Sequence, residues 1–222
     1  MRIALPKNYF DEGIASEVKS AVLAAAENFR ELGASVEEVE ISSVKHALPA
    51  YYIISSAEAS SNLSRFDGIL YGCRTEGDFN LDELYKEARS KGFGKEVKRR
   101  ILLGTYALSS GYYDAYYKKA QQVRSLIKAE FDNLFKTFDL ILSPTAPTAA
   151  YPFGSKSENP IEMYMGDIYT VPVNIAGLPG LSMNCGFDKD GLPIGMQLIG
   201  KAFDEASILR AAHAYERGGF DE

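Results

Sequence analysis

The segment "RIALPKNYFDEGIASEVKSAVLAAAENFRELGASVEEVEI", residues 2–41, decides the fold class. Its opening "RIALP" is a short apolar run of the kind that forms a buried strand. Apolar residues then recur at three- and four-residue spacing, which marks one face of a helix: Val18, Val22, Ala25, Phe29 and Leu32. Residues 35–41 alternate as a half-buried strand does. A strand, a helix and a strand in this order form a βαβ unit, which predicts an α/β fold.

Helical patterns continue beyond this segment. Asn80 is a good N-cap for one of these helices, and Gly111 is expected to separate two others. The expected helices cover residues 44–64, 80–90, 94–111, 112–138 and 204–217.

The remaining strands are expected in the last third of the chain. Residues 139–147 form a buried strand that runs into a proline-punctuated loop reaching about residue 160. Residues 181–200 read as a β-hairpin, whose first strand places four side chains on one face: Leu181, Met183, Cys185 and Phe187. No internal repeat or linker interrupts the pattern, so residues 1–222 are expected to form a single domain.

The composition narrows the class of protein. The 222 residues are 46% hydrophobic and 24% charged, and the net charge of −6 argues against general affinity for nucleic acid. Two histidines are too few for a histidine-rich metal site, so no metal is expected. Cys73 and Cys185 are expected to be buried, reduced thiols in a reducing compartment. No signal peptide or membrane span is found, so a cytoplasmic location without a membrane partner is expected.

Standard catalytic motifs are missing from the sequence. There is no G-x-S-x-G elbow, and the paired serines lie outside any glycine-rich loop that could form an oxyanion hole. No P-loop and no dinucleotide-binding glycine motif occurs either.

Two charged residues stand out by position. Arg100 follows Lys98 and Arg99 near the side of a helix that must become buried, so it needs a carboxylate partner, either from the protein or from a substrate. Asp167 lies in the irregular stretch "MGDIYTVPVNIAGLPGLSMNCG", residues 165–186. It can cap a helix that starts near Tyr169, or it can receive the ammonium group of a ligand.

Five stretches of the chain carry a resemblance to a known family. In chain order they are "SSAEASSNLSRFDGILYG", "GFGKEVKRRILLGTYALSSGYYDAYYKKAQQVR", "DLILSPTAPTAA", "YMGDIYTVPVNIAGLPGLSMNCG" and "GLPIGMQLIG". They resemble the C-terminal half of the amidase signature family, and within it the glutaminase subunits that serve glutamyl-tRNA(Gln) amidotransferases. The implied fold is a mixed, twisted sheet covered by helices.

The resemblance also implies a mechanism. Family members hydrolyse amides with a Ser–Ser–Lys triad whose serines lie in a Gly/Ser-rich signature. That signature does not occur in these 222 residues. The chain is therefore expected to be a fragment that lacks the N-terminal catalytic half and is inactive alone.

The substrate-facing residues are carried over by matching positions. The resemblance assigns Arg100 to the α-carboxylate of glutamine, with Arg99 as the alternative, and Asp167 to the α-ammonium. Tyr51 is expected to line the same pocket, with Tyr52 as the alternative. A planar guanidinium suits a carboxylate because it can pair with both oxygens.

The resemblance implies partners as well. Glutamine is the expected small-molecule substrate, and subunits B and C of an amidotransferase are the expected protein partners. ATP and Mg²⁺ are expected to be used by the partner subunit, so this chain should need no cofactor and no direct contact with nucleic acid. The isolated fragment is expected to self-associate, because removing half of a shared sheet uncovers a strand edge.

Overall fold

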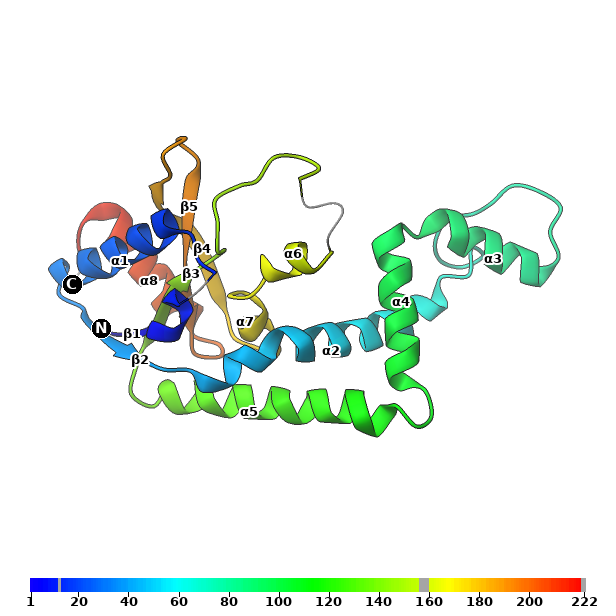
Figure 1. Cartoon of the computed structure of the whole chain (residues 1–222), viewed down its shortest axis with the longest axis horizontal. Coiled ribbons are helices and arrows are strands. Elements are labelled where there is room, and N and C mark those ends of the chain that lie inside the picture. The colour runs from blue at the N-terminus through cyan, green and yellow to red at the C-terminus, as the bar shows by residue number, and fades with distance from the viewer. Residues whose placement is uncertain (12, 156–159, 221–222) are drawn as a thin grey trace. The chain divides into compact units, whose positions relative to one another are not determined.

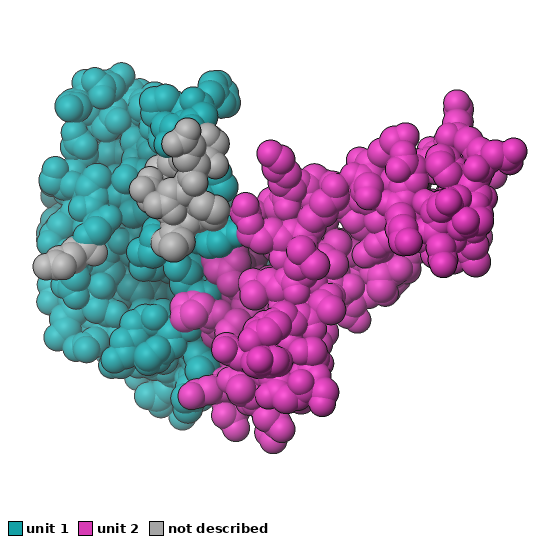
Figure 2. All heavy atoms as spheres, turned by 45° about the vertical axis from the view of Figure 1, so that its right-hand side comes forward, with its two compact units in different colours: residues 1–48, 123–222 teal, residues 49–122 magenta. Residues whose placement is uncertain are grey.

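The computed structural model describes residues 1–11, 13–155 and 160–220. The chain divides into two compact units, which Figure 2 colours teal and magenta. Unit 1 joins residues 1–48 with residues 123–222, and unit 2 is residues 49–122. The expectation of a single domain stays a prediction, because two compact units can belong to one cooperatively folding domain.

Unit 1 contains a five-stranded sheet (Figure 1) with the order β2-β1-β3-β5-β4. β1 lies parallel to β2 and β3, and β5 lies antiparallel to β3 and β4. The strands are β1 (Arg2–Pro6), β2 (Ser35–Val39), β3 (Leu140–Pro144), β4 (Gly180–Phe187) and β5 (Pro193–Gly200). The predicted α/β class and mixed sheet are confirmed.

Helices α1 (Ser16–Glu31) and α8 (Glu205–Arg217) pack against this sheet through one hydrophobic core. Phe29 of α1 and Leu198 of β5 are both fully buried within it. Burying one such side chain contributes about 1.5–3 kcal/mol, so this core is a principal source of stability in unit 1. The other helices of unit 1 are η1 (Lys7–Phe10), η2 (Ser42–His46), most of α5 (Lys119–Leu134), α6 (Pro160–Met165) and α7 (Val171–Ala176).

Unit 2 is helical, and its α-helices match the predicted ranges 44–64, 80–90 and 94–111 to within about three residues. The single helix predicted over 112–138 is instead divided into a π-helical segment and α5, which ends at Leu134. Asn80 caps one of them as predicted, in a capping box with Glu83. Gly111 has a φ of 86°, which only glycine adopts easily, and it lies in the turn between two helices as expected. The elements are α2 (Ala47–Asn62), η3 (Leu63–Arg65), α3 (Leu81–Gly92), α4 (Lys95–Leu108) and the π-helical η4 (Tyr113–Lys118).

Helices α2 and α4 approach each other closely at Gly104. A Cβ atom at this position would lie 1.9 Å from the carbonyl oxygen of Ser56. One turn along, the hydroxyls of Ser60 and Thr105 are hydrogen-bonded at 2.8 Å. Only glycine permits this approach, so Gly104 sets the spacing of the two helices.

Two local predictions are wrong. Phe187 does not share the face of Leu181 and Met183: it is 66% exposed, because a β-bulge between Asn184 and Gly186 interrupts the alternation. Cys73 is exposed rather than buried, since it lies outside the helices of unit 2. The proline-punctuated loop reaches about residue 160 as expected, because α6 begins at Pro160; its residues 156–159 lie outside the described residues.

Candidate functional site

Arg100 lies on α4 and has a carboxylate partner within its own helix. Its Nε donates to Oε1 of Glu96 at 3.2 Å, a pairing that follows from the four-residue spacing. Its side chain is 33% exposed. The Glu96 bond uses only Nε, and the terminal nitrogens of a guanidinium carry further N–H donors. The protein acid expected as one alternative is therefore present, while a substrate carboxylate stays a prediction.

Arg99 is the more exposed of the two arginines. It pairs with the other carboxylate oxygen of Glu96, and 53% of its side chain is accessible to solvent. Arg100, in contrast, has its guanidinium carbon 5.5 Å from the centre of the Tyr52 ring. Such a cation–π contact contributes about 0.5–1 kcal/mol and orients the guanidinium plane.

Tyr51 and Tyr52 are neighbours on α2, and their rings meet edge to face at 5.2 Å and 84°. The structure brings Tyr52, rather than Tyr51, into contact with Arg100. The pocket role that the resemblance gives to Tyr51 stays a prediction, and Tyr52 gains a structural role as the aromatic neighbour of the arginine.

Asp167 lies in unit 1 on an exposed turn that precedes α7. Its carbonyl oxygen accepts hydrogen bonds from the backbone N–H groups of Thr170 at 3.1 Å and Val171 at 3.0 Å. The helix that follows, α7, begins at Val171 with Thr170 as its N-cap residue, close to the start expected near Tyr169, and the capping alternative for Asp167 stays a prediction. Its ammonium-binding role stays a prediction.

Tyr169 anchors the turn that carries Asp167. It is 6% exposed, and its hydroxyl donates to the carbonyl oxygen of Tyr9 at 2.9 Å. Burial raises the pKa of Tyr169 to about 12, so the phenol stays protonated at neutral pH. The hydrogen bond therefore persists over the physiological range.

Gln197 was not identified from the sequence. It is 5% exposed, and its amide nitrogen donates to the carbonyl oxygen of Tyr169 at 3.1 Å and to the hydroxyl of Ser143 at 3.0 Å. The sequence pattern does indicate this residue, because Gln197 is the one polar side chain within the apolar run "PIGMQLIG". A polar side chain in such a run must find buried partners.

The candidate residues thus fall into two groups. Arg100 and Tyr52 meet in unit 2, and Asp167 is held with Tyr169 and Gln197 in unit 1.

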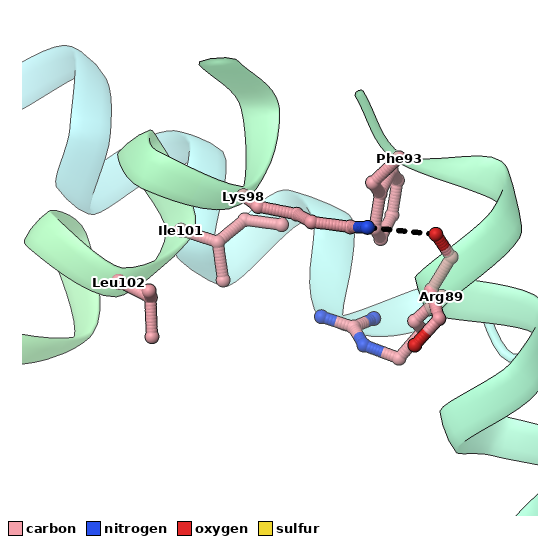
Figure 3. A pocket seen from close by; sticks show the side chains of 6 residues that line it. Arg89, Phe93, Lys98, Ile101 and Leu102 are labelled. Atoms are coloured by element: carbon pink, nitrogen blue, oxygen red, sulfur yellow. Dashed lines mark hydrogen bonds between the residues drawn. The ribbon is translucent and has the colours of Figure 1, made fainter. Parts of the chain in front are cut away.

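A separate hollow of about 290 Å³ lies in unit 2 between α3 and α4, as shown in Figure 3. Its two cations are already bound to backbone: Lys98 donates to the carbonyl of Ser90 at 2.7 Å, and Arg89 donates to that of Leu63 at 2.9 Å. Arg100 does not line it. We therefore do not place the substrate site in this hollow.

Within residues 1–11, 13–155 and 160–220, no group of three or more His, Cys, Asp or Glu side chains is placed to hold a metal ion. In the same ranges, no helix has the length and apolar character needed to cross a membrane.

Comparison with known proteins defines the class to which this fold and these residues belong. The family model described as Amidase matches residues 1–209, and the chain belongs to that family.

Individual relatives give a more specific comparison than the family model does. The chain is 58% identical over 217 residues to the A subunit of glutamyl-tRNA(Gln) amidotransferase of Brevibacillus brevis, covering 98% of this chain and 44% of that protein. It is 59% identical over 216 residues to the Streptococcus sanguinis protein of the same name, covering 97% and 44%. The chain thus spans less than half the length of the curated relatives it matches.

Solved structures agree on the fold. The crystal structure of the A subunit of glutamyl-tRNA(Gln) amidotransferase from Thermotoga maritima matches with a TM-score of 0.74 and 36% identity, over 99% of this chain and 42% of that one. A bacterial aryl acylamidase of the amidase signature family matches with a TM-score of 0.73 over 97% and 43%, at 22% identity. The second likeness concerns the fold alone.

Proposed function

We propose that this chain is the substrate-holding half of a glutaminase that supplies ammonia to a glutamyl-tRNA(Gln) amidotransferase. The identity of 58% to the A subunit of such an enzyme over 98% of the chain carries this proposal. Its substrate is free glutamine, and its partners are the other subunits of the amidotransferase, designated B and C, in the cytoplasm.

Two opposite charges give the proposed site its specificity. Arg100 pairs with the α-carboxylate of glutamine, and Asp167 pairs with the α-ammonium. An amide that lacks either end group leaves one of these charges without its partner, which costs binding energy. Tyr51 lines the pocket, and Tyr52 orients Arg100 through the contact described above.

Bond breaking is assigned to residues outside this sequence. The 222 residues contain no Gly/Ser-rich signature, and they span 44% of the Brevibacillus brevis relative. We propose that the Ser–Ser–Lys triad lies in the remaining part of a longer protein. The chain itself requires no cofactor, and ATP and Mg²⁺ act at the partner subunit that activates the glutamyl-tRNA.

Alanine variants of the two charged residues test the proposal in the complete amidotransferase. Because each charge-assisted hydrogen bond contributes about 1.5–3 kcal/mol, Arg100→Ala and Asp167→Ala should each raise the KM for glutamine roughly 10- to 100-fold. Free ammonia bypasses the glutaminase, so ammonia-supported amidation should stay at the wild-type rate. This second assay separates loss of glutamine binding from loss of assembly.

An unchanged KM for glutamine in both variants would contradict the proposal. The chain would then belong to another amidase-signature hydrolase that acts on small amides, or it would serve as a non-catalytic assembly module. Activity of the wild-type protein on simple amides, measured in parallel, distinguishes these two alternatives.

We also propose that the isolated 222-residue chain self-associates. β2 and β4 are the outer strands of the described sheet, and Phe187 on β4 is 66% exposed. An unpaired edge with an exposed aromatic side chain is a template for further strands. Light scattering should show a mass that rises with concentration, and a constant monomer mass would contradict this.

A further inference from the structure

We propose that Gln197 is a positioning residue that holds the Asp167 turn in the geometry required to bind the ammonium group of the substrate. This inference rests on the proposed function, because it takes Asp167 as the ammonium-binding residue. It adds Gln197 of strand β5, which has no direct substrate contact, to the determinants of specificity.

The contact between Gln197 and the turn is buried. Gln197 is 5% exposed on β5, and Ser143, which lies opposite it on β3, is fully buried. Opposing residues on neighbouring strands project to the same face, so the two side chains meet. The Gln197 amide nitrogen bonds to Ser143 Oγ at 3.0 Å and to the carbonyl oxygen of Tyr169 at 3.1 Å.

The chemistry of the partners fixes the orientation of the amide. A backbone carbonyl can only accept a hydrogen bond, so the NH₂ end of Gln197 must face Tyr169. The Ser143 hydroxyl donates to the carbonyl oxygen of Pro144 at 3.2 Å, which leaves its oxygen to accept from Gln197. Glutamine at position 197 therefore satisfies both acceptors at once.

A second contact holds Tyr169 through its side chain. The hydroxyl of Tyr169 donates to the carbonyl oxygen of Tyr9 at 2.9 Å, and the two tyrosine rings lie 5.3 Å apart. Tyr169 is thus tethered at its backbone by β5 and at its ring by the segment after β1. A residue tethered at both places has little freedom to move.

This tether reaches Asp167 through a short stretch of turn. Asp167 lies two residues before Tyr169, and its own carbonyl accepts from Thr170 and Val171 on the other side of Tyr169. Ile168, between them, packs against the hydrophobic core. Displacing the Tyr169 carbonyl therefore displaces the backbone from which the Asp167 carboxylate projects. Without the Gln197 amide, that carbonyl loses its buried donor.

The experiment compares glutamine with glutaramate, which is glutamine without the α-amino group, in the complete amidotransferase. Gln197→Leu keeps the approximate volume of the side chain but removes the donor. It should lower kcat/KM for glutamine about tenfold through KM, while kcat/KM for glutaramate changes less than about twofold. Ser143→Ala is a milder variant that removes one partner of the amide. It should also lower the ratio of kcat/KM for glutamine to kcat/KM for glutaramate, but by a smaller factor.

Two reference variants make the result decisive. Leu198→Ala removes packing on the opposite face of β5. It should lower the melting temperature without changing the ratio of kcat/KM for glutamine to kcat/KM for glutaramate. Asp167→Asn should lower that ratio as Gln197→Leu does. If Asp167→Asn lowers the ratio and neither Gln197→Leu nor Ser143→Ala does, the positioning role is overturned and the proposed function stands. If Asp167→Asn leaves the ratio unchanged, the proposed function fails, and the positioning role fails with it.

Discussion

The guanidinium carbon of Arg100 lies 5.5 Å from the centre of the Tyr52 ring, and this contact joins α4 to α2 within unit 2. The same arginine is bonded to Glu96 on its own helix. Its guanidinium is therefore held both by a charge and by an aromatic face. A substrate carboxylate would meet a group that is already oriented, which lowers the entropic cost of binding.

Removal of the Tyr52 ring should weaken glutamine binding through Arg100. Because the cation–π contact contributes about 0.5–1 kcal/mol, Tyr52→Ala should raise the KM for glutamine about two- to fivefold. Tyr52→Phe keeps the ring and should match the wild type. Steady-state kinetics of the complete amidotransferase measures both, and equal KM values for Tyr52→Ala and wild type would contradict the orienting role.

Replacement of Arg100 by lysine tests the geometry of the guanidinium rather than its charge. Lysine keeps the positive charge but cannot pair with both carboxylate oxygens at once, so Arg100→Lys should raise the KM for glutamine about tenfold. Arg99→Lys is the matched control and should change the KM less than about twofold. A larger effect at position 99 would show that Arg99 is the carboxylate-binding residue.

The crossing at Gly104 predicts a large loss of stability. A methyl group there would lie 1.9 Å from the Ser56 carbonyl oxygen, and backbone cannot move aside as a side chain can. Gly104→Ala should therefore lower the free energy of unfolding by about 3 kcal/mol or more. Gly94 is the N-cap residue of α4 and has no atom within 4 Å of an added Cβ, so Gly94→Ala is the control and should cost at most about 1 kcal/mol. Denaturant melts that give equal midpoints for the two variants would contradict this packing.

The buried Tyr169 predicts a loss of stability in alkali. Burial raises its pKa from its ordinary value of 10 to about 12, so between pH 10 and 12 the unfolded chain loses a proton that the folded chain keeps. The free energy of unfolding should therefore be highest below pH 10 and fall above it, with Tyr169 contributing at most about 1.4 kcal/mol per pH unit. Tyr9, buried beside it, has its pKa raised as well and should steepen the fall.

Tyr169→Phe provides the comparison. This variant should lose about 1 kcal/mol at pH 7, because the Tyr9 carbonyl loses its donor. Above pH 10 its free energy of unfolding should fall less steeply with pH, because unfolding releases one proton fewer than in the wild type. Urea melts measured across this pH range test both, and an identical slope in the two proteins would contradict the burial of the Tyr169 phenol.

The two cysteines should differ in their reaction with iodoacetamide. Cys73 is exposed, whereas Cys185 is half-buried and desolvation raises its pKa to about 11. At pH 8 only about one Cys185 in a thousand would be a thiolate, so Cys73 should react first and Cys185 much more slowly. Mass spectrometry of timed samples measures this. In Cys73→Ser the fast phase of alkylation should be lost. If it persists, the assignment of the fast reaction to Cys73 is contradicted.

Local patterns in the sequence predicted much of the fold. The helical face of Val18, Val22 and Phe29 is found in the core of unit 1, and Asn80 caps α3 in the predicted way. These features depend on neighbours a few residues away, which a sequence pattern records directly. Phe187 was misplaced because a β-bulge shifts alternation by one residue, and nothing within the strand pattern reveals it.

The candidate site was predictable only in part. Arg100 and Asp167 stand out as charged residues near apolar or irregular segments, and their roles come from the resemblance to the family. The contact with Tyr52 depends on how α2 and α4 cross, and the tether from Gln197 joins residues 28 positions apart. Such contacts follow from tertiary packing, which single-sequence periodicity does not encode.

Ammonia release from glutamine tests the central claim most directly. The purified 222-residue chain should release no ammonia above background, because the residues proposed to attack the amide lie outside this sequence. The complete amidotransferase, assayed in parallel, should release ammonia, and Arg100→Ala and Asp167→Ala should each abolish most of that release at low glutamine concentration. Release by the 222-residue chain alone would contradict the account, because a nucleophile would then lie among these residues.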